Sequence, residues 1–308
     1  MARVFWWSAA LLMLALVLPP LFYALHPERS PELPPAGRRV EVAPGLAVNV
    51  LEAGSGPTLV LVHGHPACAY DWEPTLRELG GRGYHTVAYD RVGYGRSDGR
   101  APGRVTVETN ATELLGLLAA LELRDVTLVG WSYGGAASIV AAKRDPTRVA
   151  RLVLVESVGP GIERGRRALP EPVLDFLAGP VLSWVARVPP LMRRFLAAGS
   201  RNAFHPDPVP SWYQAQVEAN FARPHTLAAF GSEGRDLGGE ADLDPGAIER
   251  PILVIHGDAD RLVPLEVGRG LAAQARFAEL RVVPHGSHML PVTHPKLLAD
   301  AIDGFVTR

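Results

Sequence analysis

The chain has 308 residues, of which 47% are hydrophobic and 20% are charged, so it can form a full hydrophobic core and is not disordered as a whole. Its 31 basic and 32 acidic residues give a net charge of −1, which argues against a nucleic-acid partner bound through bulk charge. The single cysteine, Cys68, excludes an internal disulfide and any metal site that needs several cysteines.

The N-terminal segment is apolar almost throughout and carries no charged residue between Val4 and Leu25. As a helix this stretch would be about 33 Å long, enough to cross a hydrocarbon core of about 30 Å. Aromatic side chains stand near both of its ends, where they are common at membrane interfaces. We therefore predict a transmembrane anchor over residues 1–25, with the rest of the chain on the extracytoplasmic side.

A signal peptide that is cleaved before secretion is the alternative, because Arg3 supplies the positive charge with which such peptides begin. The adjacent Pro19 and Pro20 would kink or end a helix at that point. The polar, proline-rich residues 26–38 that follow are predicted to form an extended linker.

From residue 39 onward, short runs of β-branched and aliphatic residues alternate with longer helical patterns. The later runs are nearly continuous in Val, Leu and Ile, which is typical of strands buried on both faces of a parallel sheet. The first two runs are separated by a short turn, which predicts a hairpin at an antiparallel edge. The predicted strands are Val40–Val42, Ala47–Leu51, Thr58–Val62, Thr86–Tyr89, Val126–Val129, Arg151–Val155, Pro251–Ile255 and Leu280–Val283.

The regions between the strands include helical patterns such as Val107–Leu123 and Tyr133–Lys143. This alternation predicts an α/β fold with a mostly parallel, doubly wound sheet of eight strands. The rhythm stops over residues 159–243, which are helical and interrupted by prolines. We predict that this stretch is a helical cap inserted after the sixth strand, between two parts of the core at residues 39–158 and 244–308.

A G-x-S-x-G motif centred on Ser132 runs from a predicted strand into a predicted helix. Its two glycines permit a tight turn that raises the Ser132 Oγ atom at the carboxyl edge of the sheet. The helix that follows directs free N–H groups and the positive end of its dipole toward developing negative charge. We predict that Ser132 is a nucleophile; the alternative is a glycine-rich turn in which Ser132 only caps the helix.

The segment His63–Pro66 follows an earlier predicted strand. Acyl transfer requires two donors directed at the developing oxyanion, and the backbone N–H groups of His65 and Tyr133 are suitable candidates. His63 and His65 could instead form half of a metal site, but no further ligands stand at a suitable spacing, so we predict no metal. Cys68 is expected to be a small buried apolar residue.

Two later loops, each after a predicted strand, carry acidic and basic groups. The first contains Asp258 and Asp260, either of which could orient an imidazole, and the second contains His285 and His288, either of which could be the base. Ser, Asp and His in this order, each beyond the carboxyl end of a predicted parallel strand, would lie on one edge of the sheet.

Five short motifs stand out along the chain. They are H-G-x-P at His63–Pro66, D-R-x-G-x-G-x-S at Asp90–Ser97, G-x-S-x-G-G at Gly130–Gly135, G-D-x-D-x-x-x-P at Gly257–Pro264 and G-x-H at Gly286–His288. With these motifs, the sequence resembles the α/β-hydrolase fold family over roughly residues 39–307. Taken together, the motifs are highly specific for this fold and only moderately specific for a substrate.

The resemblance implies that the acid is Asp260, the second Asp of its motif, and that the base is His288. Glu156 stands where some relatives carry the acid instead, and it is the alternative to Asp260. Epoxide hydrolases and haloalkane dehalogenases use an aspartate nucleophile and are disfavoured, because a serine stands at that position here. Asp90 and Ser97 are expected to brace the sheet edge and its loop.

These observations predict a serine hydrolase that cleaves a carboxylic ester through an acyl-enzyme, with no metal or organic cofactor. One alternative is a C–C bond hydrolase that acts on a ring-cleavage diketone with the same triad. An alternative of another class is a catalytically inactive, membrane-tethered binding protein on a hydrolase scaffold.

The expected substrate is a small apolar ester or a related acyl compound, because the predicted cap is rich in aromatic residues. Trp131 beside the nucleophile, and Trp184 and Trp212 in the cap, are the candidate substrate contacts, although such residues more often form the core of a cap. Five cap arginines could bind a substrate carboxylate, but an arginine cluster is usually a solvated surface. They are Arg164, Arg166, Arg167, Arg193 and Arg194.

Overall fold

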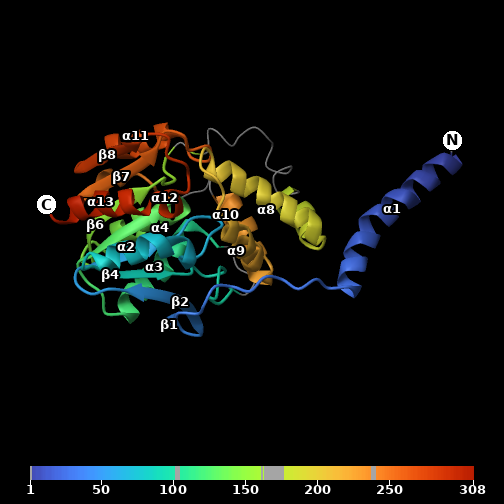
Figure 1. Ribbon diagram of the computed structural model, residues 1–308, viewed down its shortest axis with the longest axis horizontal. Coiled ribbons are helices and arrows are strands. Elements are labelled where there is room, and N and C mark those ends of the chain that lie inside the picture. Colours follow the sequence, from blue (N-terminus) through green and yellow to red (C-terminus); the bar gives the residue numbers. More distant parts are fainter. Residues whose placement is uncertain (1, 101–104, 161, 163–176, 237–240) are drawn as a thin grey trace.

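The computed structural model describes residues 2–100, 105–160, 162, 177–236 and 241–308, with only the backbone described for Ala2–Leu12, Leu14, Leu177 and Ala178. Within these residues the chain forms one eight-stranded sheet in the order β1-β2-β4-β3-β5-β6-β7-β8 (Figure 1). The strands are β1 Arg38–Ala43, β2 Leu46–Ala53, β3 Thr58–Val62, β4 His85–Tyr89, β5 Val126–Trp131, β6 Val149–Val155, β7 Ile252–Gly257 and β8 Ala278–Val283.

The pairing of the strands confirms the predicted sheet. β1 and β2 form an antiparallel hairpin, and β2 also runs antiparallel to β4. All other neighbouring strands are parallel. The carboxyl ends of β3 to β8 therefore meet at one edge of the sheet, and the loops that leave this edge carry every predicted catalytic residue.

Helices cover both faces of the sheet. β3 shows why both faces are apolar, since Val60 and Val62 join one buried cluster while Leu59 and Leu61 join the other. α3, α4 and α11 pack on the first face, and α2, α12 and α13 lie on the second. These helices are α2 Glu73–Gly81, α3 Val107–Ala120, α4 Tyr133–Arg144, α11 Leu265–Gln274, α12 Leu290–Thr293 and α13 Pro295–Val306.

The described part of the cap, residues 177–236, is helical and lies between β6 and β7 in the sequence, as predicted. Figure 1 shows α8, α9 and α10 beside the sheet domain, on the side from which the N-terminal helix extends. The predicted ends of the cap, at residues 159 and 243, stay a prediction. Its elements are η2 Leu177–Val181, α7 Leu182–Ala186, α8 Pro189–Phe204, α9 Ser211–Phe221 and α10 Pro224–Asp236. Two short 3-10 turns, η1 Ala69–Trp72 and η3 Pro245–Ala247, complete the described helices of the core.

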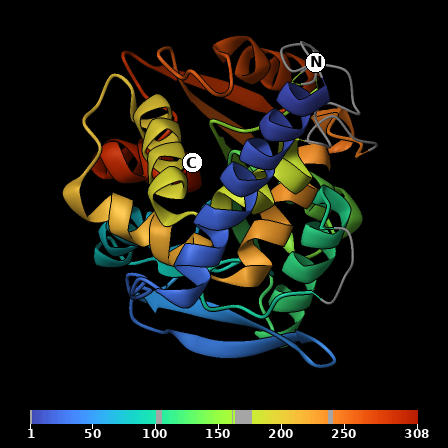
Figure 2. The same cartoon turned by 90° about the vertical axis from the view of Figure 1, so that its right-hand side faces the viewer.

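The N-terminal segment forms one helix, α1 Ala2–Leu25, which contains Pro19 and Pro20 and passes across the cap in Figure 2. In the part of the chain that the structure describes, no helix has the length and apolarity that crossing a membrane requires. The predicted transmembrane helix is therefore not supported.

The residues after α1 run along the protein without helix or strand from 27 to 37. Arg96 donates hydrogen bonds to the carbonyl groups of Leu33 and Pro34, at 2.9 and 2.6 Å. An ion pair of 2.6 Å joins Glu28 to Arg193 of α8. These contacts hold the segment against both the core and the cap.

Two glycines inside helices should respond in opposite ways to alanine. A Cβ atom on Gly116 in α3 would lie 2.3 Å from the carbonyl oxygen of Val42, so Gly116→Ala should lower the free energy of unfolding by about 1–3 kcal/mol. A Cβ atom on Gly270 in α11 would meet nothing within 4 Å, so Gly270→Ala should raise that free energy by about 0.5–1 kcal/mol. Urea unfolding measures both, and equal shifts in the two variants would contradict the packing of α3 on β1.

Candidate active site

Ser132 stands at the sharp turn between β5 and α4, with φ 54° and ψ −123°. A Cβ atom on Gly134 would lie 2.3 Å from the carbonyl oxygen of Val62, and one on Gly130 would lie 2.6 Å from the Cα atom of Gly135. The turn can therefore close only with glycine at both positions of the motif. This explains in physical terms why glycine stands two residues before and two residues after the predicted nucleophile.

The predicted base and acid form a direct hydrogen bond. His288 Nδ1 donates to Asp260 Oδ2 at 2.7 Å, and both side chains are buried. The other oxygen of Asp260 accepts from the backbone N–H groups of Leu262 and Val263, at 2.7 and 3.0 Å. Burial by itself would raise the pKa of Asp260, but His288 and these hydrogen bonds outweigh it and hold the pKa below its usual range. Asp260 is therefore ionised and fixes the tautomer of the imidazole.

Trp131 connects this pair to the serine. Its indole N–H donates to the carbonyl oxygen of His288 at 2.8 Å, and its ring lies 5.8 Å from the imidazole ring, centroid to centroid. Because Trp131 directly precedes Ser132, these contacts place His288 beside the turn that carries the serine. In the described residues the imidazole of His288 is hydrogen-bonded to Asp260 and not to Ser132. Catalytic hydrogen bonds are often long without substrate.

Asp258 and His285, the alternatives to Asp260 and His288, are arranged differently. Asp258 accepts a hydrogen bond of 2.6 Å from the backbone N–H of His285, which holds the β7 and β8 loops together. The side chain of His285 is exposed and its φ is 56°. Between the alternatives that the sequence left open, the hydrogen-bonded and buried pair is Asp260 with His288.

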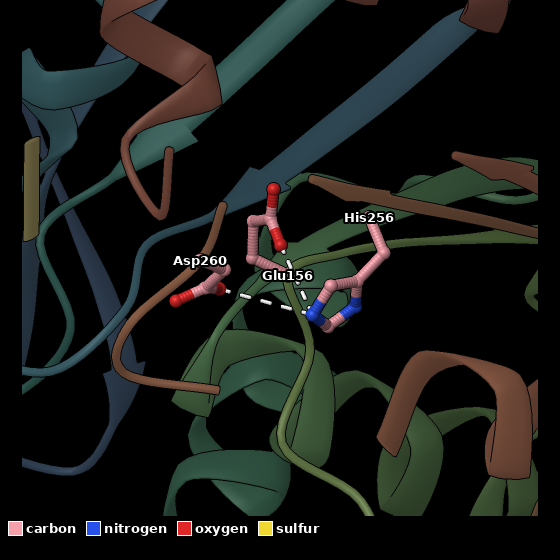
Figure 3. Close-up of side chains that lie close together, drawn as sticks. All are labelled: Glu156, His256 and Asp260. Atoms are coloured by element: carbon pink, nitrogen blue, oxygen red, sulfur yellow. Dashed lines mark ion pairs between the residues drawn. The ribbon is translucent and has the colours of Figure 1, made fainter. Parts of the chain in front are cut away.

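A second carboxyl group, Glu156, lies directly beside Asp260, as Figure 3 shows. Burial raises the pKa of Glu156 well above its usual range, and the nearby Asp260 raises it further. Glu156 shares a hydrogen bond with Asp260, and its Oε1 atom accepts from the N–H of Gly257 at 2.8 Å. Two adjacent carboxyl groups cannot both ionise at low cost, so Glu156 is the protonated partner that donates to Asp260.

His256, in β7, completes this cluster and was missed by the sequence reasoning. Its Nε2 atom lies 3.2 Å from Glu156 and 3.8 Å from Asp260, and it donates to the carbonyl oxygen of Val263 at 2.9 Å. The three side chains are close enough to hold a metal ion. However, Nε2 carries the proton that binds Val263, and Asp260 is already bound by His288. The donor set therefore does not fit a metal, and we assign none.

The loop after β3 lies against the serine. A Cβ atom on Gly64 would be 2.9 Å from the Cβ atom of Ser132, so the backbone that leads to His65 passes directly beside the predicted nucleophile. Tyr133 follows the serine and begins α4, so its N–H has no acceptor within the helix. The two predicted oxyanion donors therefore belong to segments that flank Ser132.

His63 is not available as a metal ligand. Its Nδ1 atom donates to the carbonyl oxygen of Gly64 at 2.8 Å, and its Nε2 atom accepts from the N–H of Arg91 at 2.9 Å. Burial lowers the pKa of His63 well below its usual value, and the Arg91 charge lowers it further. Arg91 itself was not singled out from the sequence, although it belongs to the D-R-x-G motif. It is fully buried and donates to the carbonyl oxygens of His63 and Gly64 at 3.0 and 2.9 Å.

The three tryptophans predicted to contact substrate lie in different places. Trp131 is buried, and Trp184 donates to the carbonyl oxygen of Leu16 in α1 at 2.6 Å. Trp212 is 41% exposed and lines a cavity of about 340 Å³ together with Tyr70 and with Glu32 and Pro34, which follow α1. None of the three predicted triad residues lines that cavity.

The remaining predicted residues behave as structural groups or lie outside the described residues. Asp90 accepts from Asn49 and from two backbone N–H groups, while the hydroxyl of Ser97 donates to the carbonyl oxygen of Asp90 at 2.6 Å. Cys68 is buried, and burial raises the pKa of its thiol. The cap arginines Arg164, Arg166 and Arg167 lie outside the described residues.

Comparisons with known proteins agree with this fold. Residues 59–301 match the model of the alpha/beta hydrolase family. Among curated proteins, the chain is 29% identical to a 2-hydroxymuconate semialdehyde hydrolase of Pseudomonas sp. (strain CF600), covering 91% of this chain and 96% of that protein. It is 30% identical to a non-heme chloroperoxidase of Streptomyces lividans, covering 82% of this chain and 92% of that protein.

Solved structures show the same fold. An esterase from Exiguobacterium antarcticum superposes with a TM-score of 0.74 at 22% identity, covering 88% of this chain and 100% of that one. A hydrolase from Pseudomonas aeruginosa PA01 superposes with a TM-score of 0.69 at 26% identity, covering 88% of this chain and 98% of that one. The chain belongs to the alpha/beta hydrolase family, and it is a hydrolase.

Proposed function

We propose that the protein is a serine hydrolase that cleaves a carboxylic ester with Ser132 as nucleophile, His288 as base and Asp260 as acid. The observation that supports this most directly is the buried hydrogen bond of 2.7 Å between His288 Nδ1 and Asp260 Oδ2, beside the turn that carries Ser132. An imidazole held in this tautomer leaves the lone pair of its Nε2 atom available to accept the serine proton.

In the proposed reaction, the Ser132 oxygen attacks the ester carbonyl carbon while His288 Nε2 takes the hydroxyl proton. The carbonyl oxygen becomes an oxyanion that the backbone N–H groups of His65 and Tyr133 stabilise. His288 then gives its proton to the departing alcohol, which leaves an acyl group on Ser132. A water that loses its proton to the same imidazole attacks this ester, and His288 returns the proton to the serine as the acid product leaves.

A C–C bond hydrolase is the second candidate, and some of the curated relatives support it. They include a 2-hydroxymuconate semialdehyde hydrolase and a 2-hydroxy-6-oxo-2,4-heptadienoate hydrolase, at 29% and 30% identity, whereas others are non-heme haloperoxidases. The same three residues and oxyanion donors would serve such a reaction. In the described part of the cap, Arg193 is paired with Glu28, so it is not an open site for a substrate carboxylate. The extracytoplasmic location of the protein stays a prediction.

Ser132→Ala should abolish covalent labelling by a fluorophosphonate probe, because the variant lacks the oxygen that attacks phosphorus. Circular dichroism should show an unchanged fold. Ser200→Ala is the matched control, since its hydroxyl donates to the carbonyl of Leu196 within α8, and it should label like the wild type. Labelling that persists in Ser132→Ala would refute the assigned nucleophile. A wild type that is never labelled would favour the inactive binding protein.

Asp260→Asn should lower kcat by roughly 10³- to 10⁴-fold, because a neutral amide lacks the charge that stabilises the imidazolium and can present its NH₂ group to Nδ1, which favours the wrong tautomer. Glu156→Gln should keep kcat within about threefold, because a side-chain amide still donates to Asp260 as the protonated Glu156 does. Steady-state kinetics with one ester substrate measure both variants. If Glu156→Gln lost as much activity as Asp260→Asn, the acid assignment would be wrong.

Short p-nitrophenyl esters should be hydrolysed with a kcat/KM at least tenfold higher than that for a vinylogous diketone acid. The physical reason is that an alkoxide or phenoxide leaves directly, whereas a C–C hydrolase must also bind the substrate carboxylate and stabilise a carbanion. Both reactions are followed by absorbance with the same enzyme preparation. Faster turnover of the diketone, with labelling of Ser132 intact, would make the second candidate the function.

A further inference from the structure

Cap helix α10 carries two buried carboxylates, Glu233 and Asp236, three residues apart on the helix. Each one binds the side chain of a predicted oxyanion donor. The imidazole Nδ1 of His65 donates to Glu233 Oε2 at 2.9 Å, and the hydroxyl of Tyr133 donates to Asp236 Oδ2 at 2.8 Å. One helix of the cap therefore contacts both residues that flank the nucleophile.

The Glu233 contact continues into the backbone of the same loop. The guanidinium of Arg91 binds both oxygens of Glu233, and neither side chain is exposed to solvent. The same guanidinium donates to the carbonyl oxygen of Gly64 at 2.9 Å, one residue before His65. Arg91 thus bridges the cap helix and the backbone whose N–H is needed in the reaction. A buried ion pair of this kind tolerates the loss of one partner poorly.

The surroundings of Glu233 keep it ionised and immobile. Burial by itself would raise its pKa, but the Arg91 charge and the hydrogen bond from His65 lower the pKa to about 2. Tyr94 and Asn110 also donate to the carboxylate, at 2.8 and 3.1 Å. On its other side the imidazole of His65 stacks on Phe230 of the same helix, with 4.6 Å between ring centroids. His65 is therefore held on two sides by α10.

Asp236 anchors the next turn of α10 to two helices of the core. In addition to the Tyr133 hydroxyl, its Oδ2 atom accepts from the backbone N–H of Val107, at the start of α3, at 2.7 Å. The contact with Tyr133 is at the start of α4, directly after Ser132. The position of α10 is thereby coupled to the first residue of the nucleophile helix.

We propose that α10 positions the oxyanion hole, with Glu233 and Asp236 as positioning residues for the N–H donors of His65 and Tyr133. Oxyanion donors act only when they lie about 2.7–3.1 Å from the developing charge, so small displacements of either segment reduce the rate. The hole is complete only when the cap is seated on the core. This inference rests on the proposed serine-hydrolase function.

Three variants test it: Glu233→Gln, Asp236→Ala, which removes the acceptor of the Tyr133 hydroxyl, and Tyr133→Phe, which removes the hydroxyl but keeps the backbone N–H. Each should lower kcat for an ester about 10- to 100-fold with KM within about threefold, because the contact matters in the transition state and not in ground-state binding. A boronic acid inhibitor should lose affinity in parallel, while the carboxylate product should not. Glu218→Gln in α9, whose side chain accepts from Gln214, is the control and should change none of these values.

Glu233→Gln leaves the buried Arg91 without its charged partner and can lower the melting temperature, so Tyr133→Phe and Asp236→Ala carry the test if it unfolds. The double variant Tyr133→Phe/Asp236→Ala should be no slower than Asp236→Ala alone, because both substitutions remove the hydrogen bond between the Tyr133 hydroxyl and Asp236. Folded variants with unchanged kcat, or with a raised KM and unchanged kcat, would overturn the inference. Fluorophosphonate labelling separates the two failures: if the wild type is unlabelled, the proposed function fails and the inference fails with it.

Discussion

The site depends on one constraint, the parallel pairing of β3 with β5, of β5 with β6, of β6 with β7 and of β7 with β8. Parallel strands that pair in register must all end at the same edge, so segments separated by as many as 157 positions, such as Trp131 and His288, come into contact there. The apolar strands that make this pairing stable leave their polar residues in the loops at the edge. The chemistry of the protein is therefore concentrated where the sheet ends.

At that edge, the carboxyl groups of Asp260 and Glu156 lie side by side, and their pKa values are shifted in opposite directions. Asp260 is held ionised by His288 and by backbone N–H groups, whereas burial keeps a proton on Glu156. The neutral acid stabilises its ionised neighbour by a hydrogen bond without adding a second negative charge. Because the two pKa values are shifted in opposite directions, Asp260 can accept the hydrogen bond of the His288 imidazole as a carboxylate, while the neutral Glu156 donates a hydrogen bond to Asp260.

The cap also makes buried contacts with the core close to Ser132. Its helix α10 reaches the core through a fully buried ion pair, Arg91 with Glu233, and through the hydrogen bond of Asp236 with Tyr133. Arg91 in turn donates to the carbonyl of Gly64 in the loop beside Ser132, and Tyr133 directly follows Ser132. In the proposed mechanism, the position of the cap and the geometry of the oxyanion hole are therefore physically connected, because a cap that moves would carry these side chains with it.

Local patterns alone determined much of this protein. The continuous apolar runs predicted all eight strands, and the motif around Ser132 predicted the turn, because a strand and a glycine-rich turn are specified by neighbouring residues. The choice of Asp260 and His288 over Asp258 and His285 came from the family resemblance, and their hydrogen bond agrees with it; their catalytic roles stay predictions. The contacts of His256, Arg91, Glu233 and Asp236 were decided by the tertiary structure alone. Their significance depends on which side chains from distant segments are buried together, and no spacing along the chain encodes that proximity.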